Sequence, residues 1–78
     1  MFYRTYGKTG LKMSALGFGT AYLPTHEDET CDVERAAPLL QHAIDLGVNH
    51  LDTAYAYIKE TSELAVGRAL KGYDREKL

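Results

Sequence analysis

The sequence has one cysteine, two prolines, no tryptophan and no long run of apolar residues. The single Cys31 cannot form a disulfide within the chain, which is typical of a reducing compartment, and we expect a cytoplasmic location. No histidine and cysteine residues have the spacing of a zinc site, so we predict no metal. No apolar stretch approaches the roughly 18 residues of a membrane helix, and no secretory signal is present, so we expect no membrane contact.

Neither sign of charge dominates the sequence. Its 9 Lys and Arg residues and 11 Asp and Glu residues are scattered, and the formal net charge is −2. Because there is no basic stripe, we expect no nucleic-acid partner. A hydrophobic content of 45% indicates a folded globular chain. A chain this short buries only about 60% of its unfolded surface, so it is one domain at most.

Two β-structures are predicted near the N-terminus. The segments "FYRTY" and "LKMSAL" flank the turn "GKTG", which predicts a β-hairpin within residues 1–14. The following "ALGFGT" predicts a short buried strand whose main chain lies close to a neighbour at Gly17 and Gly19. The polar segment "PTHEDETCD" then predicts a loop.

Two helices and a second strand follow. From Val33 to Gly47 the apolar residues have helical spacing, with Asp32 in the capping position. Pro38 lies inside this segment and predicts either a bend or a later helix start, because proline removes a main-chain hydrogen bond. "VNHLDT" predicts a second buried strand and "SELAVGRALKGY" a second helix. The residues of this helix expected to be buried are Leu64, Val66, Ala69 and Leu70.

The predicted order is hairpin, strand, helix, strand, helix, then a charged turn with a third strand beginning at residues 77–78. Strands that alternate with helices predict an α/β fold with parallel pairing and right-handed crossovers. Parallel strands need cover on both faces, and two strands with two helices leave an edge open. We therefore expect residues 15–78 to be the opening part of a larger sheet or barrel, preceded by the hairpin of residues 1–14.

Two phosphate-binding motifs are present only in part. "GKT" at residues 7–9 resembles the end of a P-loop, but the motif needs a glycine where Phe2 stands. "GFGTAY" resembles a dinucleotide fingerprint, but its third glycine would be Tyr22 and no helix is predicted to start there. The turn and strand interpretations are therefore preferred.

The stretch "LDTAYAY" at residues 51–57 holds the main candidates for chemistry. Asp52 closes an apolar strand at the end where α/β folds place their sites. If buried there, its carboxylate needs a cation or backbone amides as partners. Tyr57 follows five residues later. His50 shares the strand parity of Asp52 but is interpreted as a packed histidine, and Lys59 as a solvated loop charge.

The segments "YRTYGKTGLKMSALGFGT" at 3–20, "AIDLGVNHLDTAYAY" at 43–57 and "SELAVGRALKGYDREKL" at 62–78 together resemble the N-terminal part of the aldo-keto reductases. The resemblance implies a (β/α)8 barrel closed at the bottom by the hairpin, of which this chain would hold the hairpin and the first two βα units. It further implies NADP(H)-dependent reduction of small carbonyl substrates, aldehydes and ketones, to alcohols.

The resemblance also assigns site residues. Asp52 matches the catalytic aspartate that holds a lysine, and Tyr57 matches the proton-donating tyrosine. Gly19, Thr20 and Ala21, together with Asp52, match positions at the nicotinamide end of NADP(H). The lysine and a substrate-steering histidine would follow residue 78, so we expect the 78-residue chain alone to be inactive. Two alternatives stay open: a non-catalytic nicotinamide-binding protein, as in channel-associated family members, and a truncated barrel that self-associates through its unpaired strand edge.

Overall fold

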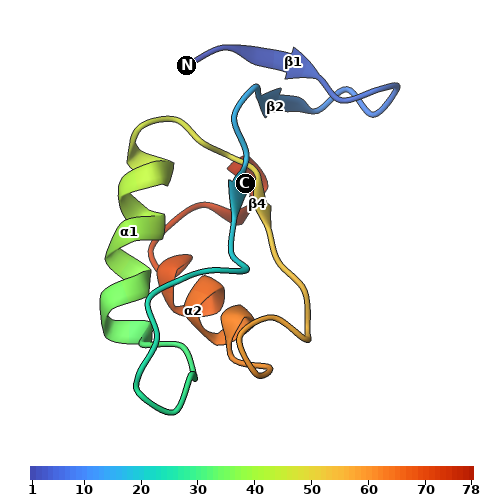
Figure 1. Cartoon of the computed structure of the whole chain (residues 1–78). Helices are drawn as coiled ribbons and strands as arrows, with labels where there is room; N and C mark the ends of the chain where they lie inside the picture. The colour runs from blue at the N-terminus through green and yellow to red at the C-terminus, as the bar shows by residue number, and fades with distance from the viewer.

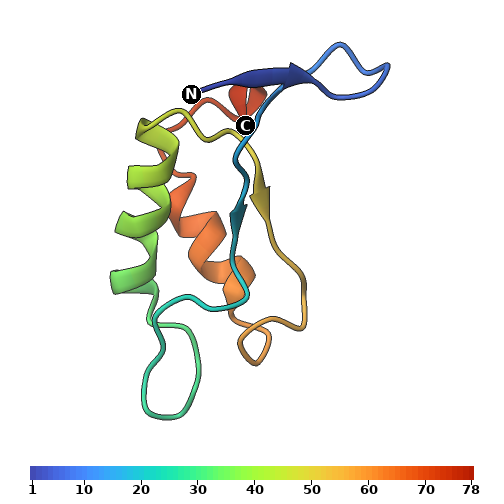
Figure 2. The same ribbon diagram turned by 45° about the horizontal axis from the view of Figure 1, so that its top comes forward.

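The computed structural model describes all 78 residues, as a hairpin joined to a small sheet with two helices (Figure 1). β3 spans Phe18–Gly19 and β4 spans Leu51–Asp52, while α1 spans Val33–Asp45 and α2 spans Ser62–Ala69. Both helices lie on the same side of the strand pair in both views (Figure 2). The hairpin lies at one end of the molecule, and the loops that follow β3 and β4 lie at the other end.

The predicted hairpin is present. β1 (Tyr3–Thr5) pairs in antiparallel fashion with β2 (Lys12–Ser14), and the "GKTG" turn joins them. Gly7 and Gly10 have φ angles of 55° and 77°, a left-handed conformation that glycine adopts without a steric penalty. The two glycines of the motif thus serve the turn, in agreement with the preferred interpretation of "GKT".

The hairpin is attached to the rest of the chain through Asn49. Its Oδ1 accepts a hydrogen bond from the Ser14 main-chain N–H at 2.7 Å, and its Nδ2 donates to the Lys12 carbonyl at 2.7 Å. The side chain therefore pairs with the edge of β2 much as a neighbouring strand would. Nearby, the Tyr3 hydroxyl donates to the Gly47 carbonyl at 2.6 Å.

β3 and β4 form the predicted parallel pair, with Phe18 opposite Leu51 and Gly19 opposite Asp52. The prediction of buried strands is wrong in extent, because Phe18 and Leu51 are half-buried and Gly19 and Asp52 are exposed. Parallel strands are buried when layers cover both faces. Here the helices cover one face and nothing covers the other (Figure 2).

α1 begins at Val33, so the later start that Pro38 suggested is wrong. The Asp32 side chain accepts a hydrogen bond from the Arg35 N–H at 3.3 Å, and the Asp32 carbonyl accepts one from the Ala36 N–H at 2.8 Å. These bonds stabilise the first turn before the chain reaches Pro38. The helix therefore continues through the proline, although the carbonyl of Glu34, four residues earlier, loses its usual N–H donor.

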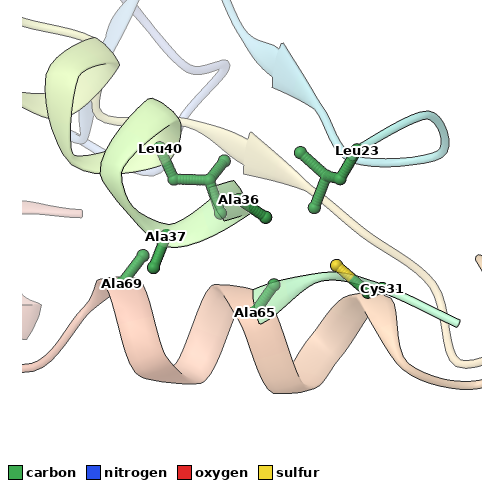
Figure 3. Packing of buried hydrophobic residues seen from close by; sticks show 7 residues of the cluster. All are labelled: Leu23, Cys31, Ala36, Ala37, Leu40, Ala65 and Ala69. Carbon is green, nitrogen blue, oxygen red and sulfur yellow. The ribbon is translucent and has the colours of Figure 1, made fainter. Parts of the chain in front are cut away.

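The core is formed by α1, α2 and the segment between β3 and α1, and is made largely of small side chains (Figure 3). Small residues allow the helix axes to approach closely. On α2 the buried residues include Ala65 and Ala69, which lie four positions apart on one face. The prediction that Leu64 is buried is wrong, since it is 63% exposed. The cluster consists of Leu23, Cys31, Ala36, Ala37, Leu40, Ala65 and Ala69.

The third strand predicted at residues 77–78 is absent. A 3-10 helix, η1, spans Arg75–Lys77 instead, and the Asp74 side chain caps it by accepting a hydrogen bond from the Glu76 N–H at 3.0 Å. A strand requires a paired neighbour for its main-chain groups, and this segment satisfies them by local bonds. Neither α1 nor α2 has the length and apolar character of a membrane-crossing helix.

Candidate active site

Asp52 and Gly19 lie side by side as the last residues of β4 and β3. The preceding pair of residues in the two strands, Phe18 and Leu51, packs against the helix core. Because side chains alternate between the faces of a sheet, Asp52 faces away from the helices. The aspartate is thus at the carboxyl end of a parallel pair, on the face that a barrel would turn toward its interior.

The Asp52 carboxylate is exposed, and the chain provides it with no hydrogen bond and no ion pair. The sequence suggested that burial would require a cation or loop amides as partners. Asp52 is not buried in these 78 residues, because the strand face that carries it has no covering layer, so the requirement does not arise. The carboxylate is therefore open to solvent.

The main chain at Asp52 is held by buried hydroxyl groups. Thr20 Oγ1 donates to the Asp52 carbonyl at 2.9 Å, and the Thr20 N–H donates to the same oxygen at 3.0 Å. Ser62 Oγ lies 3.0 Å from the Thr20 carbonyl, 2.9 Å from Thr20 Oγ1 and 3.2 Å from Thr53 Oγ1. Thr20 and Ser62 are fully buried. These bonds fasten the ends of both strands to the start of α2.

Ser62 and Thr53 were missed by the sequence interpretation. A short polar side chain at the start of a predicted helix usually indicates a cap exposed to solvent, so nothing local marked Ser62 as buried. The available signal was that Thr53 directly follows the strand and that Ser62 opens the next helix. Two such hydroxyl-bearing residues can meet where a strand end and a helix start converge.

The three residues after the first strand that the resemblance assigns to the cofactor, Gly19, Thr20 and Ala21, differ in solvent exposure. A Cβ placed on Gly19 would have no atom within 4 Å, so the main chain there is open on one side. The predicted close approach at Gly19 is therefore not made by protein atoms, whereas at Gly17 a Cβ would lie 2.8 Å from His50 Nδ1. Thr20 is buried with its hydroxyl on Asp52, and Ala21 is half-buried. The open main chain at Gly19 thus lies beside the exposed Asp52.

The carboxyl ends of β3 and β4, at Gly19 and Asp52, are called the rim below. Tyr57 lies in the loop that follows β4 from this rim, and the residue is half-buried. Its N–H donates to the Ala54 carbonyl at 3.2 Å, and its own carbonyl accepts from the N–H groups of Thr61 and Ser62, both at 3.3 Å. The main chain of Tyr57 is therefore bonded to the start of α2. Ser62 thus contacts both the Asp52 strand end and the Tyr57 loop.

A left-handed turn follows Tyr57 directly. Ile58, Lys59 and Glu60 have φ angles of 52°, 51° and 67°, although none is glycine. This conformation costs roughly 1–2 kcal/mol per residue, and a β-branched side chain such as Ile58 is poorly suited to it. Contacts elsewhere must hold the turn. One of them is from Lys59, whose Nζ donates to the Asp28 carbonyl at 2.9 Å. The side chain is exposed, in agreement with its interpretation as a solvated loop charge.

His50 is packed against a glycine of the neighbouring segment. Its ring lies against Gly17 near the hairpin end of the strand. This packed position agrees with the interpretation preferred from the sequence. No set of three or more His, Cys, Asp or Glu side chains is arranged to bind a metal ion.

Residues 15–78 match the model of a protein family described as the aldo/keto reductase family. The chain belongs to this family. It is 43% identical over 75 residues to a Schizosaccharomyces pombe protein named "Putative voltage-gated potassium channel subunit beta". That match covers 94% of this chain and 21% of the yeast protein.

The structure of a thermostable aldo-keto reductase, Tm1743, in complex with the inhibitor epalrestat is similar to this chain at a TM-score of 0.81 and 38% identity. The match covers 100% of this chain and 29% of the solved one. The α/β arrangement described above therefore corresponds to part of an aldo-keto reductase barrel. The chain spans less than a third of the length of these two relatives.

Proposed function

We propose that these residues contribute Asp52 and Tyr57 to the active site of an NADP(H)-dependent reductase that converts aldehydes and ketones to alcohols. In this proposal residues 1–14 close the bottom of a (β/α)8 barrel, and residues 15–78 form its first two βα units. The observation that carries the proposal is the position of Asp52. It ends a parallel strand beside the open main chain of Gly19, and Tyr57 lies in the loop that follows.

Tyr57 is proposed to supply a proton. A nicotinamide held at this rim would supply the hydride for the carbonyl carbon, which would leave negative charge on the carbonyl oxygen. A phenol positioned at that oxygen neutralises the charge by donating its proton as the alcohol forms. The bonds between the Tyr57 carbonyl and the start of α2 limit the movement of the loop that carries this phenol.

Asp52 is proposed to hold a lysine beside Tyr57. A phenol has an ordinary pKa of about 10, and a nearby ammonium group lowers that value, which helps proton transfer at neutral pH. None of the lysines of this chain forms an ion pair with Asp52. In the proposal the lysine comes from a later barrel strand, and the exposed Asp52 carboxylate faces the side from which it would approach.

Gly19, Thr20, Ala21 and Asp52 are proposed to line the nicotinamide end of NADP(H). Gly19 supports this role because its main chain is open, with no atom within 4 Å of an added Cβ. Thr20 would act through the main chain, since its buried hydroxyl is already bonded to Asp52. These residues form one edge of the site, and the remaining contacts would come from other parts of the barrel.

A second candidate is a nicotinamide-binding protein that assembles with a channel and does not depend on turnover. The 43% identity to the yeast protein named as a potassium channel subunit favours it. A self-associating half-barrel is the third possibility, suggested by the unpaired strand edges of the two-stranded β3–β4 sheet (Figure 1).

The test uses a complete barrel built by joining residues 1–78 to the remaining strands of the thermostable reductase. Titration with NADPH, followed by nicotinamide fluorescence, separates both nicotinamide-binding candidates from an assembly module. NADPH oxidation with a reactive aldehyde such as 4-nitrobenzaldehyde then separates a reductase from a sensor. We expect both binding and turnover. Binding without turnover would favour the channel-associated candidate, and absence of binding would contradict both.

A further inference from the structure

The left-handed turn at residues 58–60 directly follows the proposed proton donor and is held by contacts to another loop. The segment that it touches lies between β3 and α1, about 30 residues earlier in the sequence. Three consecutive residues with positive φ are unfavourable without glycine. Such strain persists where the surrounding structure over-determines the conformation, and it is concentrated at functional sites.

Lys59 makes the first of these contacts. Its Nζ donates to the Asp28 carbonyl at 2.9 Å and lies 3.3 Å from Glu29 Oε2. The ion pair is exposed at both ends, with side-chain exposures of 57% and 77%, and such pairs contribute little. The hydrogen bond to the carbonyl is also exposed, and it is the shorter of the two contacts.

The Asp28 carbonyl belongs to a turn that is itself braced. Thr30 donates to Asp28 Oδ1 twice, from its N–H at 3.0 Å and from its hydroxyl at 2.6 Å. These bonds hold the pKa of the Asp28 carboxyl below its ordinary value, because they favour the charged form. The His26 N–H also donates to the Thr30 carbonyl at 2.8 Å. Lys59 thus binds a turn of defined geometry.

Thr61 makes the second contact between the two loops. Its Oγ1 accepts from the Cys31 N–H at 2.8 Å and donates to the Ile58 carbonyl. Thr61 and Ser62 in turn donate their N–H groups to the Tyr57 carbonyl. Unwinding of residues 58–60 would therefore move the main chain of Tyr57.

We infer that Lys59 is a positioning residue for Tyr57. It fastens the left-handed turn to the loop before α1 and so sets where the Tyr57 phenol stands relative to the rim at Asp52. The inference rests on the proposed function, in that Tyr57 must be the proton donor for its position to affect turnover. The physical link from Lys59 to the turn can be tested without that assumption.

The first test measures hydrogen exchange by mass spectrometry on a peptide covering residues 54–64, in the 78-residue chain and in the complete barrel. Lys59→Met should increase the exchange rate in this peptide about tenfold or more. Lys59→Arg should exchange as slowly as the parent, because arginine keeps a cationic N–H donor for the Asp28 carbonyl. Lys71→Met is the matched control, since the Lys71 side chain has no partner in the chain. Glu29→Gln should also leave exchange unchanged. Exchange within twofold of the parent in Lys59→Met would overturn the inference.

The second test measures kcat and KM for a reactive aldehyde in the complete barrel. Misplacement of a catalytic group by about 1 Å can reduce the rate a hundredfold. We expect Lys59→Met to lower kcat by about ten- to a hundredfold with KM nearly unchanged, and Lys59→Arg to recover most of it. Loosened exchange with unchanged kcat would refute the positioning role. If Tyr57→Phe itself retained full turnover, the proposed function would fail, whereas the exchange result would still decide whether Lys59 holds the turn.

Discussion

Thr20 and Asp52, 32 residues apart in the sequence, are joined by two hydrogen bonds to one oxygen. The Thr20 hydroxyl and N–H both donate to the Asp52 carbonyl, at 2.9 Å and 3.0 Å. Ser62 bonds to Thr20 from the start of α2. The rim is therefore built on the main chain of Asp52, and the carboxylate takes no part in holding the fold. This separation leaves the carboxylate free for a cation or a ligand.

Ser62→Ala should reduce the free energy of unfolding by about 1–3 kcal/mol, because it leaves the buried oxygen atoms of Thr20 and the half-buried hydroxyl of Thr53 with fewer partners. Urea unfolding followed by circular dichroism measures the change. Thr25→Ala is the control, since it removes an exposed hydroxyl that has no hydrogen-bond partner in the chain. Equal stability of the two variants would show that the hydroxyl network contributes little.

Leu40→Ala should cost about 2–5 kcal/mol in unfolding free energy, because it opens a cavity in the core. Leu40 is fully buried in the core cluster, while its neighbour Leu39 is 49% exposed. Leu39→Ala should therefore change stability by about 0.5 kcal/mol or less. The two variants differ by one position on the same helix, so similar losses would contradict the described packing.

Tyr57→Phe in the complete barrel should lower kcat for carbonyl reduction by orders of magnitude and leave the dissociation constant for NADPH nearly unchanged. The phenol proton is needed mainly in the transition state, so its loss affects turnover more than binding. Tyr6→Phe serves as a control, because this hydroxyl lies on the exposed hairpin and makes no hydrogen bond. Turnover of Tyr57→Phe within a few-fold of the parent would rule out Tyr57 as the acid.

Cys31 should react slowly with iodoacetamide while the chain is folded. The residue is 5% exposed, and burial, followed by the charge of Asp32, raises the pKa of its thiol. The reactive thiolate is therefore scarcer at pH 8 than in the unfolded chain. Because the unfolded thiol ionises first, this residue should make folding less favourable as the pH rises above the ordinary thiol pKa. Equal labelling rates with and without urea at pH 8 would contradict the prediction.

The 78-residue chain produced alone should associate and should not reduce carbonyls. Covering about 300 Å² of exposed apolar surface contributes roughly 7 kcal/mol at about 25 cal/mol per Å², which is comparable with the whole stability of a small domain. Asp52 also lacks a lysine partner within the chain. Analytical sedimentation and NADPH oxidation measure the two properties, and an active monomer would contradict both. The exposed side chains include Leu11, Leu16, Leu39, Leu46 and Leu64.

Local features of the sequence predicted several elements well. The hairpin followed from a glycine-containing turn between two β-prone segments, and α1 followed from apolar spacing after Asp32. The parallel pairing of β3 and β4 followed from their alternation with helices. The positions of Asp52 at a strand end and of Tyr57 in the next loop also needed only local spacing. Their chemical roles remain predictions.

Other features depended on segments far apart in the sequence. Burial of the strands was overestimated, because it depends on whether a second layer covers the sheet. Leu64 was expected in the core, but Ala65 and Ala69 occupy the face of α2 that meets α1. The third strand at residues 77–78 did not form, since a strand needs a neighbour and a 3-10 helix does not.

What the sequence alone predicted and what only the tertiary structure decided differ in how far apart in the sequence the interacting residues lie. Helix spacing, turn chemistry and the distance from Asp52 to Tyr57 are encoded within a few residues, so the amino-acid order is sufficient to predict them. The bond from Lys59 to the Asp28 carbonyl and the bonds of Ser62 to Thr20 join residues 31 and 42 positions apart. Such contacts exist only after the helices have packed, because packing is what brings the two loops and the two strand ends together.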